Sequence, residues 1–298
     1  MRILHIASEN ISGVPLTLVK AHQKHGHYAR LITYFKNRLG HGEDIVLDLP
    51  FSNTMGLKSI KRMLRVGTYR IGGKPDKLKV WKPSPIEKII LPFRDRVWMW
   101  KIKPYLDFIR GFDVYFLDGG MGFLRSGRIV RELRDMGKHI RIIYLGSDLR
   151  TRGVFPHIEE LAEKIYTVEL DHTLLHKGVE YIFFPFDVWR FTTRKREDHV
   201  VTICHAPTNR YLKGTEYLIR AYMEMKDKYP VKLLIMENMP HHKVLKLKYE
   251  MCDILVDQLT DRGGFGYGIN SLEALSMGIP CVTYLNPFYE TLFRTILS

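Results

Sequence analysis

The feature that most constrains the fold is the alternation of short apolar runs with amphipathic segments along nearly the whole chain. Arg2–Ala7 is an apolar run of strand length, and after a glycine turn apolar residues recur at helical spacing as far as His25. In the second half, a β-branched run at Val200–Cys204 precedes apolar residues at helical spacing from Tyr217 to Met225. Strands that alternate with helices in this way predict parallel, doubly wound sheets with right-handed crossovers.

The alternation is interrupted after Pro185 by a charged segment with no clear period. This segment, "FPFDVWRFTTRKRED", predicts a linker between two domains. We therefore expect an N-terminal domain over residues 1–190 and a C-terminal domain over residues 191–298. The 298 residues, of which 45% are hydrophobic, are enough to build two ordinary cores.

The composition also predicts the compartment. No run reaches the roughly 18 apolar residues that a membrane-spanning helix needs, and the N-terminal "MRILHIAS" is too short for a signal peptide. Cys204, Cys252 and Cys281 are widely spaced, which fits neither a disulfide framework nor a metal knuckle. We therefore expect a cytoplasmic protein in a reducing environment.

The positive charge is concentrated in one stretch, residues 55–103. The chain has a formal net charge of +14, and this stretch holds 14 Lys and Arg against 3 Asp and Glu, an excess of 11 (14 minus 3). It also contains Trp81, Trp98 and Trp100. Basic residues interleaved with aromatic ones predict contact with anionic lipid headgroups or nucleic acid; a solvated basic loop is the alternative.

The strand at Val200–Cys204 is followed by the loop "HAPTNRYLKGT", which carries two cations just before a helix. Gly214 marks the turn, and Thr215 is the expected N-cap of that helix. Open α/β sheets bind ligands at the carboxyl ends of their strands, and helix N-termini attract anions. Arg210 and Lys213 therefore predict a phosphate or diphosphate site, with two solvated loop cations as the alternative.

A second loop, "DRGGFGYGINSLEALSMGIPCV", places several glycines before another helix. Without a Cβ atom, Gly266 and Gly268 let the backbone approach a bound group closely. Glu273 lies early in the helix, where its carboxylate can accept two hydrogen bonds from the diol of a ribose. A flexible loop with a surface glutamate is the alternative, because this glycine spacing is not the dinucleotide fingerprint.

The two loops together predict a binding site for a nucleotide sugar. Asp257, which ends the strand before the glycine loop, is a further donor-side candidate. Asn238 follows another strand and would either border the nucleobase or form a turn. Gly13, in the first strand–helix turn, would either face the diphosphate or simply form that turn.

Three segments of the second half resemble a known family. "HAPTNRYLKGT", "YEMCDILVDQL" and "GYGINSLEALSMGIPCVTY" look like the C-terminal domain of family 4 glycosyltransferases of the GT-B fold, particularly bacterial polysaccharide-type members. "MRILHIAS", "GSDLR" and "FPFDVWRF" are more loosely similar to the N-terminal half. The resemblance implies an α/β fold of two Rossmann-like domains facing a cleft. It also implies that Arg210 and Lys213 hold the donor diphosphate and Glu273 the ribose, with anomeric retention and neither a metal nor another cofactor.

The glycine loop departs from the family pattern at one position. Many members have a second glutamate eight residues before the helix glutamate, directed at the donor sugar. Phe265 occupies that position here, so Asp261 or Gln258 would have to take its place.

Two further departures concern the first half and the end of the chain. Leu145 stands where members often carry a histidine, so Asp148 or Arg150 would line the site instead, unless Asp148 is only a helix N-cap. The chain ends at Ser298, whereas members usually continue after the last strand, so we expect an incomplete C-terminal domain.

Taken together, the sequence predicts a glycosyltransferase that lies on the inner face of the membrane. It would move a sugar from a nucleotide diphosphate donor to a lipid-linked or saccharide acceptor, with Arg210, Lys213 and Asp148 closest to the chemistry. A nucleotide-sugar-binding pseudoenzyme is the first alternative, favoured by Phe265 and Leu145. A basic nucleic-acid-binding protein is the second, and it lacks any recognisable reading motif.

Overall fold

The computed structural model describes residues 1–37, 39–50, 77–193 and 200–297. The chain divides into two compact units, and the main division falls between Phe183 and Phe184. Part of the expected basic stretch, residues 55–76, lies outside the described residues. Within the described ranges, no helix has both the length and the apolar character needed to cross a membrane.

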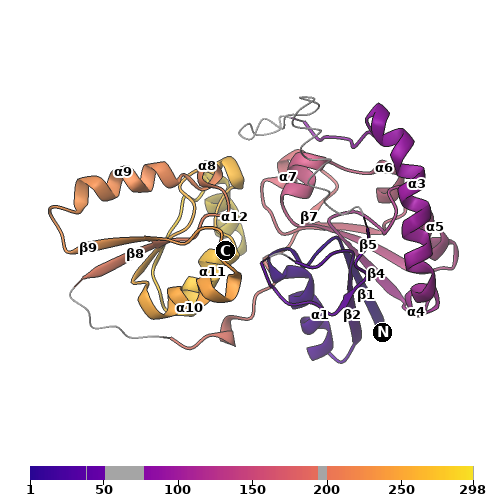
Figure 1. Cartoon of the computed structure of the whole chain (residues 1–298), viewed down its shortest axis with the longest axis horizontal. Helices are drawn as coiled ribbons and strands as arrows, with labels where there is room; N and C mark the ends of the chain where they lie inside the picture. The colour runs from indigo at the N-terminus through magenta and orange to yellow at the C-terminus, as the bar shows by residue number, and fades with distance from the viewer. Residues whose placement is uncertain (38, 51–76, 194–199, 298) are drawn as a thin grey trace. The chain divides into compact units, whose positions relative to one another are not determined.

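The first unit contains a parallel sheet of seven strands in the order β3-β2-β1-β4-β5-β6-β7. The strands are β1 (Arg2–Ala7), β2 (Tyr28–Thr33), β3 (Ile45–Val46), β4 (Val114–Asp118), β5 (His139–Tyr144), β6 (Lys164–Thr167) and β7 (Glu180–Tyr181). The helices are α1 (Val14–Lys24), α3 (Pro85–Ile102), α4 (Leu106–Arg110), α5 (Arg128–Asp135), α6 (Pro156–Glu159) and α7 (His172–Leu175) (Figure 1). The strand order reverses between β1 and β4, as in a doubly wound fold.

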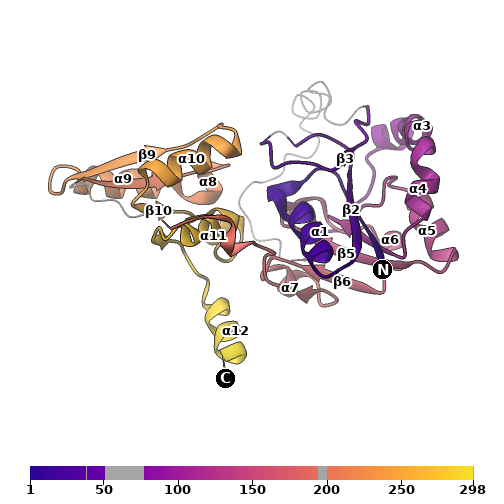
Figure 2. The same ribbon diagram turned by 90° about the horizontal axis from the view of Figure 1, so that it is seen from below.

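Both faces of this sheet are covered by helices. Along β1, Leu4 and Ile6 belong to the large core on the side of α3 and α5, whereas His5 lies 5.4 Å, between ring centroids, from His22 of α1. Successive residues of a strand point to opposite faces, so α1 and α5 cover opposite faces (Figure 2). The strands and helices that alternate along the sequence therefore form a sheet whose two faces are both buried under helices.

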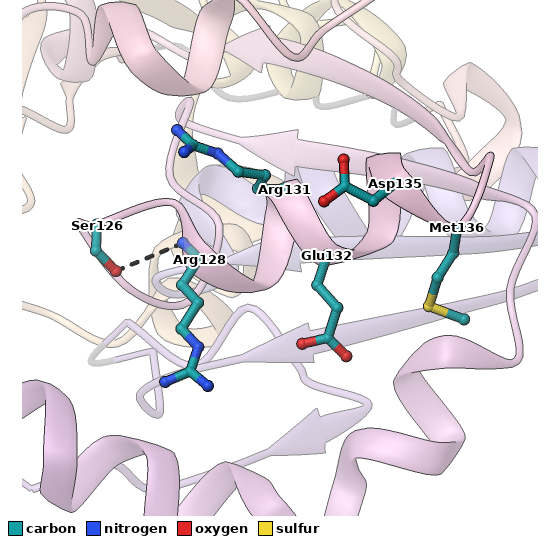
Figure 3. Close-up of a pocket in the computed structure, with 6 residues that line it drawn as sticks. All are labelled: Ser126, Arg128, Arg131, Glu132, Asp135 and Met136. Carbon is teal, nitrogen blue, oxygen red and sulfur yellow. Dashed lines mark hydrogen bonds between the residues drawn. The ribbon is translucent and has the colours of Figure 1, made fainter.

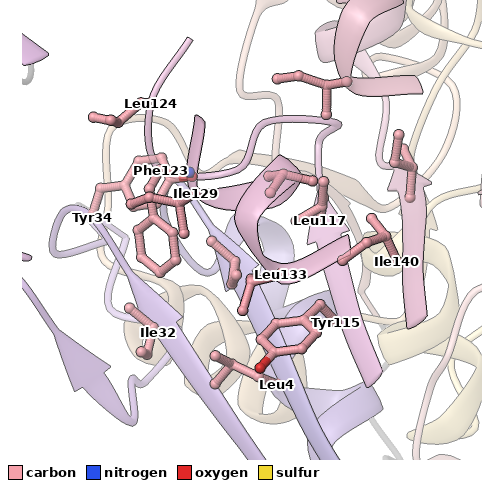
Figure 4. Close-up of a cluster of buried hydrophobic side chains, with 14 of the residues drawn as sticks. Leu4, Ile32, Tyr34, Tyr115, Leu117, Phe123, Leu124, Ile129, Leu133 and Ile140 are labelled. Carbon is pink, nitrogen blue, oxygen red and sulfur yellow. The ribbon is translucent and has the colours of Figure 1, made fainter. Parts of the chain in front are cut away.

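The core of the first unit forms where α5 packs on the strands. Figure 4 shows Ile129 and Leu133 of α5 among Tyr115 and Leu117 of β4. The buried hydroxyl of Tyr34 is satisfied: it donates to the carbonyl of Met121 at 2.8 Å and accepts from the backbone of Phe123 at 2.6 Å. A buried polar atom at the centre of the core is therefore tolerated because it is fully paired.

The sequence by itself predicts a helix from about Arg94 to Ile109. In the structure, α3 begins nine residues earlier, and the predicted range is divided between the end of α3, the turn Lys103–Tyr105 and the short α4. The start of α3 is specified by Ser84 and Glu87, which form a capping box, and by Pro85 in the first turn. This signature is visible in the sequence, but it lies inside the basic stretch, where the apolar periodicity is poor. The local cap thus decides where the helix begins.

The second unit contains a smaller parallel sheet in the order β11-β10-β8-β9. Its strands are β8 (Val201–His205), β9 (Val231–Ile235), β10 (Ile254–Val256) and β11 (Cys281–Val282). Its helices are α8 (Arg210–Lys213), α9 (Thr215–Met225), α10 (His241–Met251), α11 (Ile269–Ser276) and α12 (Pro287–Leu297). The order reverses between β8 and β10, so this sheet is also doubly wound, with Cys204 and Ile203 in cores on opposite faces.

Two local expectations for this unit are corrected. Asn209 caps a short helix, α8, within the segment expected to be a loop, because its side chain accepts a hydrogen bond from the backbone of Leu212 at 3.0 Å. Gly214, in the left-handed conformation at φ +73°, stands at the N-cap of α9, and Thr215 is the first helical residue. The hydroxyl of Thr215 is instead hydrogen-bonded to Nε2 of His205 at 2.8 Å, and this contact connects α9 to the end of β8.

Candidate donor site in the second unit

Lys213 and Asp257 meet at the point where the strand order of the second sheet reverses. Lys213 ends α8, which follows β8, and Asp257 directly follows the neighbouring strand β10. The Lys213 Nζ donates to Asp257 Oδ1 at 2.8 Å. Ligands of open α/β sheets bind at such a reversal, beyond the carboxyl ends of the strands. The structure therefore brings two sequence-predicted residues together at the strand-order reversal.

Asp257 is held as a buried, charged carboxylate. It is 1% exposed, and it also accepts hydrogen bonds from Asn270 Nδ2 at 3.0 Å and Ser271 Oγ at 2.6 Å. Burial alone pushes its pKa up, but the charge of Lys213 and these hydrogen bonds outweigh burial and lower the pKa to about 2. Asp257 thus fixes the position of the Lys213 ammonium group, which has further donors for a ligand.

The N-terminus of α11 adjoins this ion pair, since Asn270 and Ser271 belong to its first turn. Gly268 is the N-cap of α11, and a Cβ atom there would meet nothing within 4 Å, so the backbone is open at this point. Gly266 is different: a Cβ atom would lie 2.7 Å from the ring of Tyr289, so packing alone requires a glycine. Of the two predicted glycines, only Gly268 stands beside open space.

Arg210 is placed nearby but is already paired. Its guanidinium group donates to both carboxylate oxygens of Glu237, at 2.8 and 3.0 Å, and to Glu216 at 3.1 Å. These bonds raise the pKa of Arg210 and lower that of Glu237. To bind a phosphate, Arg210 would have to exchange one of these carboxylates for it.

Glu273 lies within the packed interface between α10 and α11. It is 4% exposed, its carboxylate accepts from His241 Nε2 at 2.5 Å, and it forms an ion pair with the fully buried Lys248. Burial alone would raise its pKa, but His241 and Lys248 lower it. Glu273 thus links two helices, and its contact with a ribose remains a prediction.

The other sequence candidates lie in varied settings. Asn238 has φ +53°, a conformation that suits its turn-forming interpretation. Phe265 is buried. The side-chain amide of Gln258 donates to the carbonyl of Gly264 at 2.7 Å, so Gln258 supports the glycine loop.

Gly13 and Asp148 belong to the first unit. Gly13 has φ +75° at the start of α1, so it is required by the turn. Asp148 accepts hydrogen bonds from the backbone N–H groups of Leu145, Gly146 and Leu149 at 2.8–2.9 Å. The Asp148 carboxylate therefore organises the turn after β5, and its part in catalysis remains a prediction.

Sequence reasoning missed a polar pair at the order reversal of the first sheet. The carboxylate of Asp118, the last residue of β4, is hydrogen-bonded to Nδ1 of His5 in β1 at 3.0 Å. Both side chains are buried. Burial raises the pKa of Asp118, although His5 opposes the rise. The signal was present as "DVYFLDGG", an acidic residue between an apolar strand and a glycine turn.

A shallow hollow of about 490 Å³ runs along α5 (Figure 3). It is lined by Ser126, Arg128, Arg131, Glu132, Asp135 and Met136. Most of these side chains are exposed, and they carry charges of both signs. The hollow contains none of the predicted site residues, and we assign it no ligand. Across the described ranges, no three His, Cys, Asp or Glu side chains are grouped to hold a metal ion.

The fold belongs to the GT-B class, with two parallel α/β units of the Rossmann type. One similar solved structure is an alpha-glucosyltransferase in complex with UDP and a 13-mer DNA, with a TM-score of 0.54 and 11% identity, covering 94% of this chain and 78% of that one. Another is the catalytic domain of Starch Synthase IV from Arabidopsis thaliana bound to ADP and acarbose, with a TM-score of 0.50 and 10% identity, covering 94% and 82%. No protein-family model matches the sequence, and no curated protein matches it. At these identities, the likeness establishes the fold.

Proposed function

We propose that this protein is a family 4-like glycosyltransferase of the hexosyltransferase type. It would transfer a sugar from a nucleotide diphosphate donor to a lipid-linked or saccharide acceptor, with retention and without a metal ion. The observation that carries the proposal is the Lys213–Asp257 ion pair, which lies beside the open N-terminus of α11 at the strand-order reversal. Both similar structures contain a nucleoside diphosphate, UDP in one and ADP in the other, which supports this ligand class.

The chemistry requires little more than electrostatic stabilisation of the departing diphosphate. Lys213 is rigidly held, so its ammonium group is preorganised for negative charge that develops during the reaction. The N-terminus of α11 adds backbone N–H groups, and Arg210 adds a second cation once it leaves Glu237 or Glu216. Asp257 acts through Lys213 and is a positioning residue.

The donor domain in this proposal is the second unit, and the first unit binds the acceptor. Asn238, which follows β9, borders the nucleobase, and Glu273 recognises the ribose from α11. We place the protein in the cytoplasm at an anionic membrane surface, where a lipid-linked acceptor resides.

The decisive experiment is a thermal-shift screen of nucleoside diphosphates, followed by calorimetry with the best one. A ligand at 100 times its Kd stabilises the folded state by about 2.7 kcal/mol, which is a clear shift. Wild-type protein should bind one diphosphate, and Lys213→Met should bind it more weakly while keeping its affinity for the nucleoside. If no nucleoside diphosphate stabilises the protein, the donor site is wrong.

Turnover is tested separately with a radiolabelled nucleotide sugar and membrane extract. Transfer of label to lipid or saccharide supports an active enzyme. Donor binding without transfer or hydrolysis would instead identify a pseudoenzyme, in keeping with Phe265 at the position of the family glutamate.

A further inference from the structure

Helix α3 of the first unit exposes an apolar face to solvent. Its inward side consists of Arg94, Trp98 and Ile102, all buried. Its outward apolar residues are Ile86, Ile89, Ile90, Phe93 and Trp100, with exposed fractions of 48%, 79%, 39%, 62% and 71%. Isolated exposed apolar residues are ordinary, but five on one helix form a surface that calls for an explanation.

The spacing places these five residues on one side. At 100° per residue, they fall within an arc of about 100°, whose centre lies about 140° from that of the inward residues. By the same geometry, Arg96 and Lys101 flank the two edges of this arc, and both are exposed. The outward side of α3 is therefore an apolar surface with a basic residue at each edge.

The charge around this face is almost purely positive. Lys82, Arg96, Lys101 and Lys103 are exposed in and around α3. The two carboxylates of α3 are paired with arginines: Glu87 with Arg125 at 3.4 Å and Asp95 with Arg94 at 2.6 Å. Because these carboxylates are already paired, the exposed cations dominate the charge at the surface.

We infer that α3 lies in the interface of an anionic lipid bilayer, with its apolar face among the acyl chains and its cations at the headgroups. A basic amphipathic helix with aromatic residues is the form that binds in the plane of a membrane. Trp100 suits the boundary between headgroups and acyl chains. A second copy of the chain is a poorer partner, because two such surfaces would bring their positive charges together.

This inference deepens the membrane location within the proposed function, because it names the helix and side chains that contact lipid. The docking itself does not require glycosyl transfer. If the proposed function also holds, the acceptor is of the lipid-linked class, since α3 belongs to the unit that binds it.

The test is sedimentation of the full chain with vesicles of neutral phosphatidylcholine, and with vesicles that also contain phosphatidylglycerol. Wild-type protein should bind the anionic vesicles and bind the neutral ones at least tenfold more weakly. Ile89→Ser combined with Trp100→Ser should lower partitioning to anionic vesicles at least tenfold. The matched control is Trp189→Ser, which removes a residue that is 90% exposed in the second unit and should change partitioning less than twofold.

A second set, Arg96→Gln with Lys101→Gln, should remove most of the preference for anionic vesicles. Melting temperatures of all variants within about 2 °C of wild type would show that folding is intact; because the altered side chains are exposed, we expect this result. Unchanged vesicle binding by the Ile89→Ser, Trp100→Ser variant would overturn the inference. So would a concentration-dependent dimer, seen by sedimentation velocity, that the same variant abolishes.

Nucleotide calorimetry on the same variants separates this inference from the proposed function. Variants that lose vesicle binding should keep full affinity for the nucleoside diphosphate. If wild type binds vesicles through α3 but binds no nucleotide, the proposed function fails while the docking surface stands.

Discussion

Lys213 Nζ lies 2.8 Å from Asp257 Oδ1, although 44 residues separate them in the sequence. The ammonium group comes from the helix after β8 and the carboxylate from the end of β10, the two strands between which the sheet order reverses. A buried carboxylate that holds a partly exposed cation in place is a way to preorganise positive charge for an anionic ligand.

Lys213→Met should weaken binding of the nucleoside diphosphate about tenfold or more, with little change for the nucleoside. The reason is that a hydrogen bond to a charged group contributes roughly 1.5–3 kcal/mol. Isothermal titration calorimetry with both ligands measures the difference. Lys243→Met, which removes an exposed lysine of α10, is the matched control and should bind like wild type. Equal losses for nucleoside and diphosphate would contradict the assignment of Lys213 to the phosphates.

Glu237→Gln should strengthen diphosphate binding, by up to about fivefold, because it releases Arg210 from its bidentate partner and exposed ion pairs are modest in strength. Glu216→Gln removes only the single bond to Arg210 and should have the smaller effect. Arg210→Ala should act in the opposite direction. Calorimetry at two salt concentrations checks all three variants, and a loss of affinity in Glu237→Gln would show that Glu237 itself contacts the nucleotide.

Asp257 should make folding stability depend on pH in the acid range. Its pKa is about 2 in the folded protein, against 3.8 as the ordinary value, so the unfolded state binds more protons between these values. The stabilisation is therefore present above about pH 4 and is lost as the pH falls towards 2, an effect on the order of 2 kcal/mol. Urea unfolding between pH 2 and 6 measures this slope, and it should be shallower in Asp257→Asn. An identical slope in the two proteins would show that Asp257 is not held as a carboxylate.

Glu273→Gln should lower the melting temperature because it leaves the buried Lys248 without its counter-charge. Removing one partner of a buried ion pair costs about 3–5 kcal/mol. Lys248→Met should be destabilising alone, while the double variant should regain much of the lost stability. Nucleotide affinity, measured on the Glu273→Gln, Lys248→Met protein, tests the ribose role apart from folding. Affinity within twofold of wild type would remove Glu273 from the donor site.

Several boundaries could be placed from the sequence because the signals were local. The strand Arg2–Ala7 matches β1 residue for residue, and the apolar run near Val200 corresponds to β8. The start of α3 was missed although its capping box is also local, because Ser84 lies in a stretch whose charge obscured the periodicity. The helix α12 was missed as well, although Asn286 and Pro287 are ordinary helix-start residues, because the domain was expected to end after the last strand.

The sequence by itself determined the class of fold, and it predicted a phosphate ligand at two loops. Apolar periodicity, glycine turns and the order of strands and helices are local properties, and local properties are enough for parallel, doubly wound sheets. Only the tertiary structure decided what each candidate contacts. It brought Lys213 to Asp257, gave Arg210 two carboxylates, and set Glu273 against Lys248, because such pairs depend on how separate elements pack. It also decided which face of α3 is exposed, since the spacing of Ile89 and Trp100 does not show which side of the helix the core will cover.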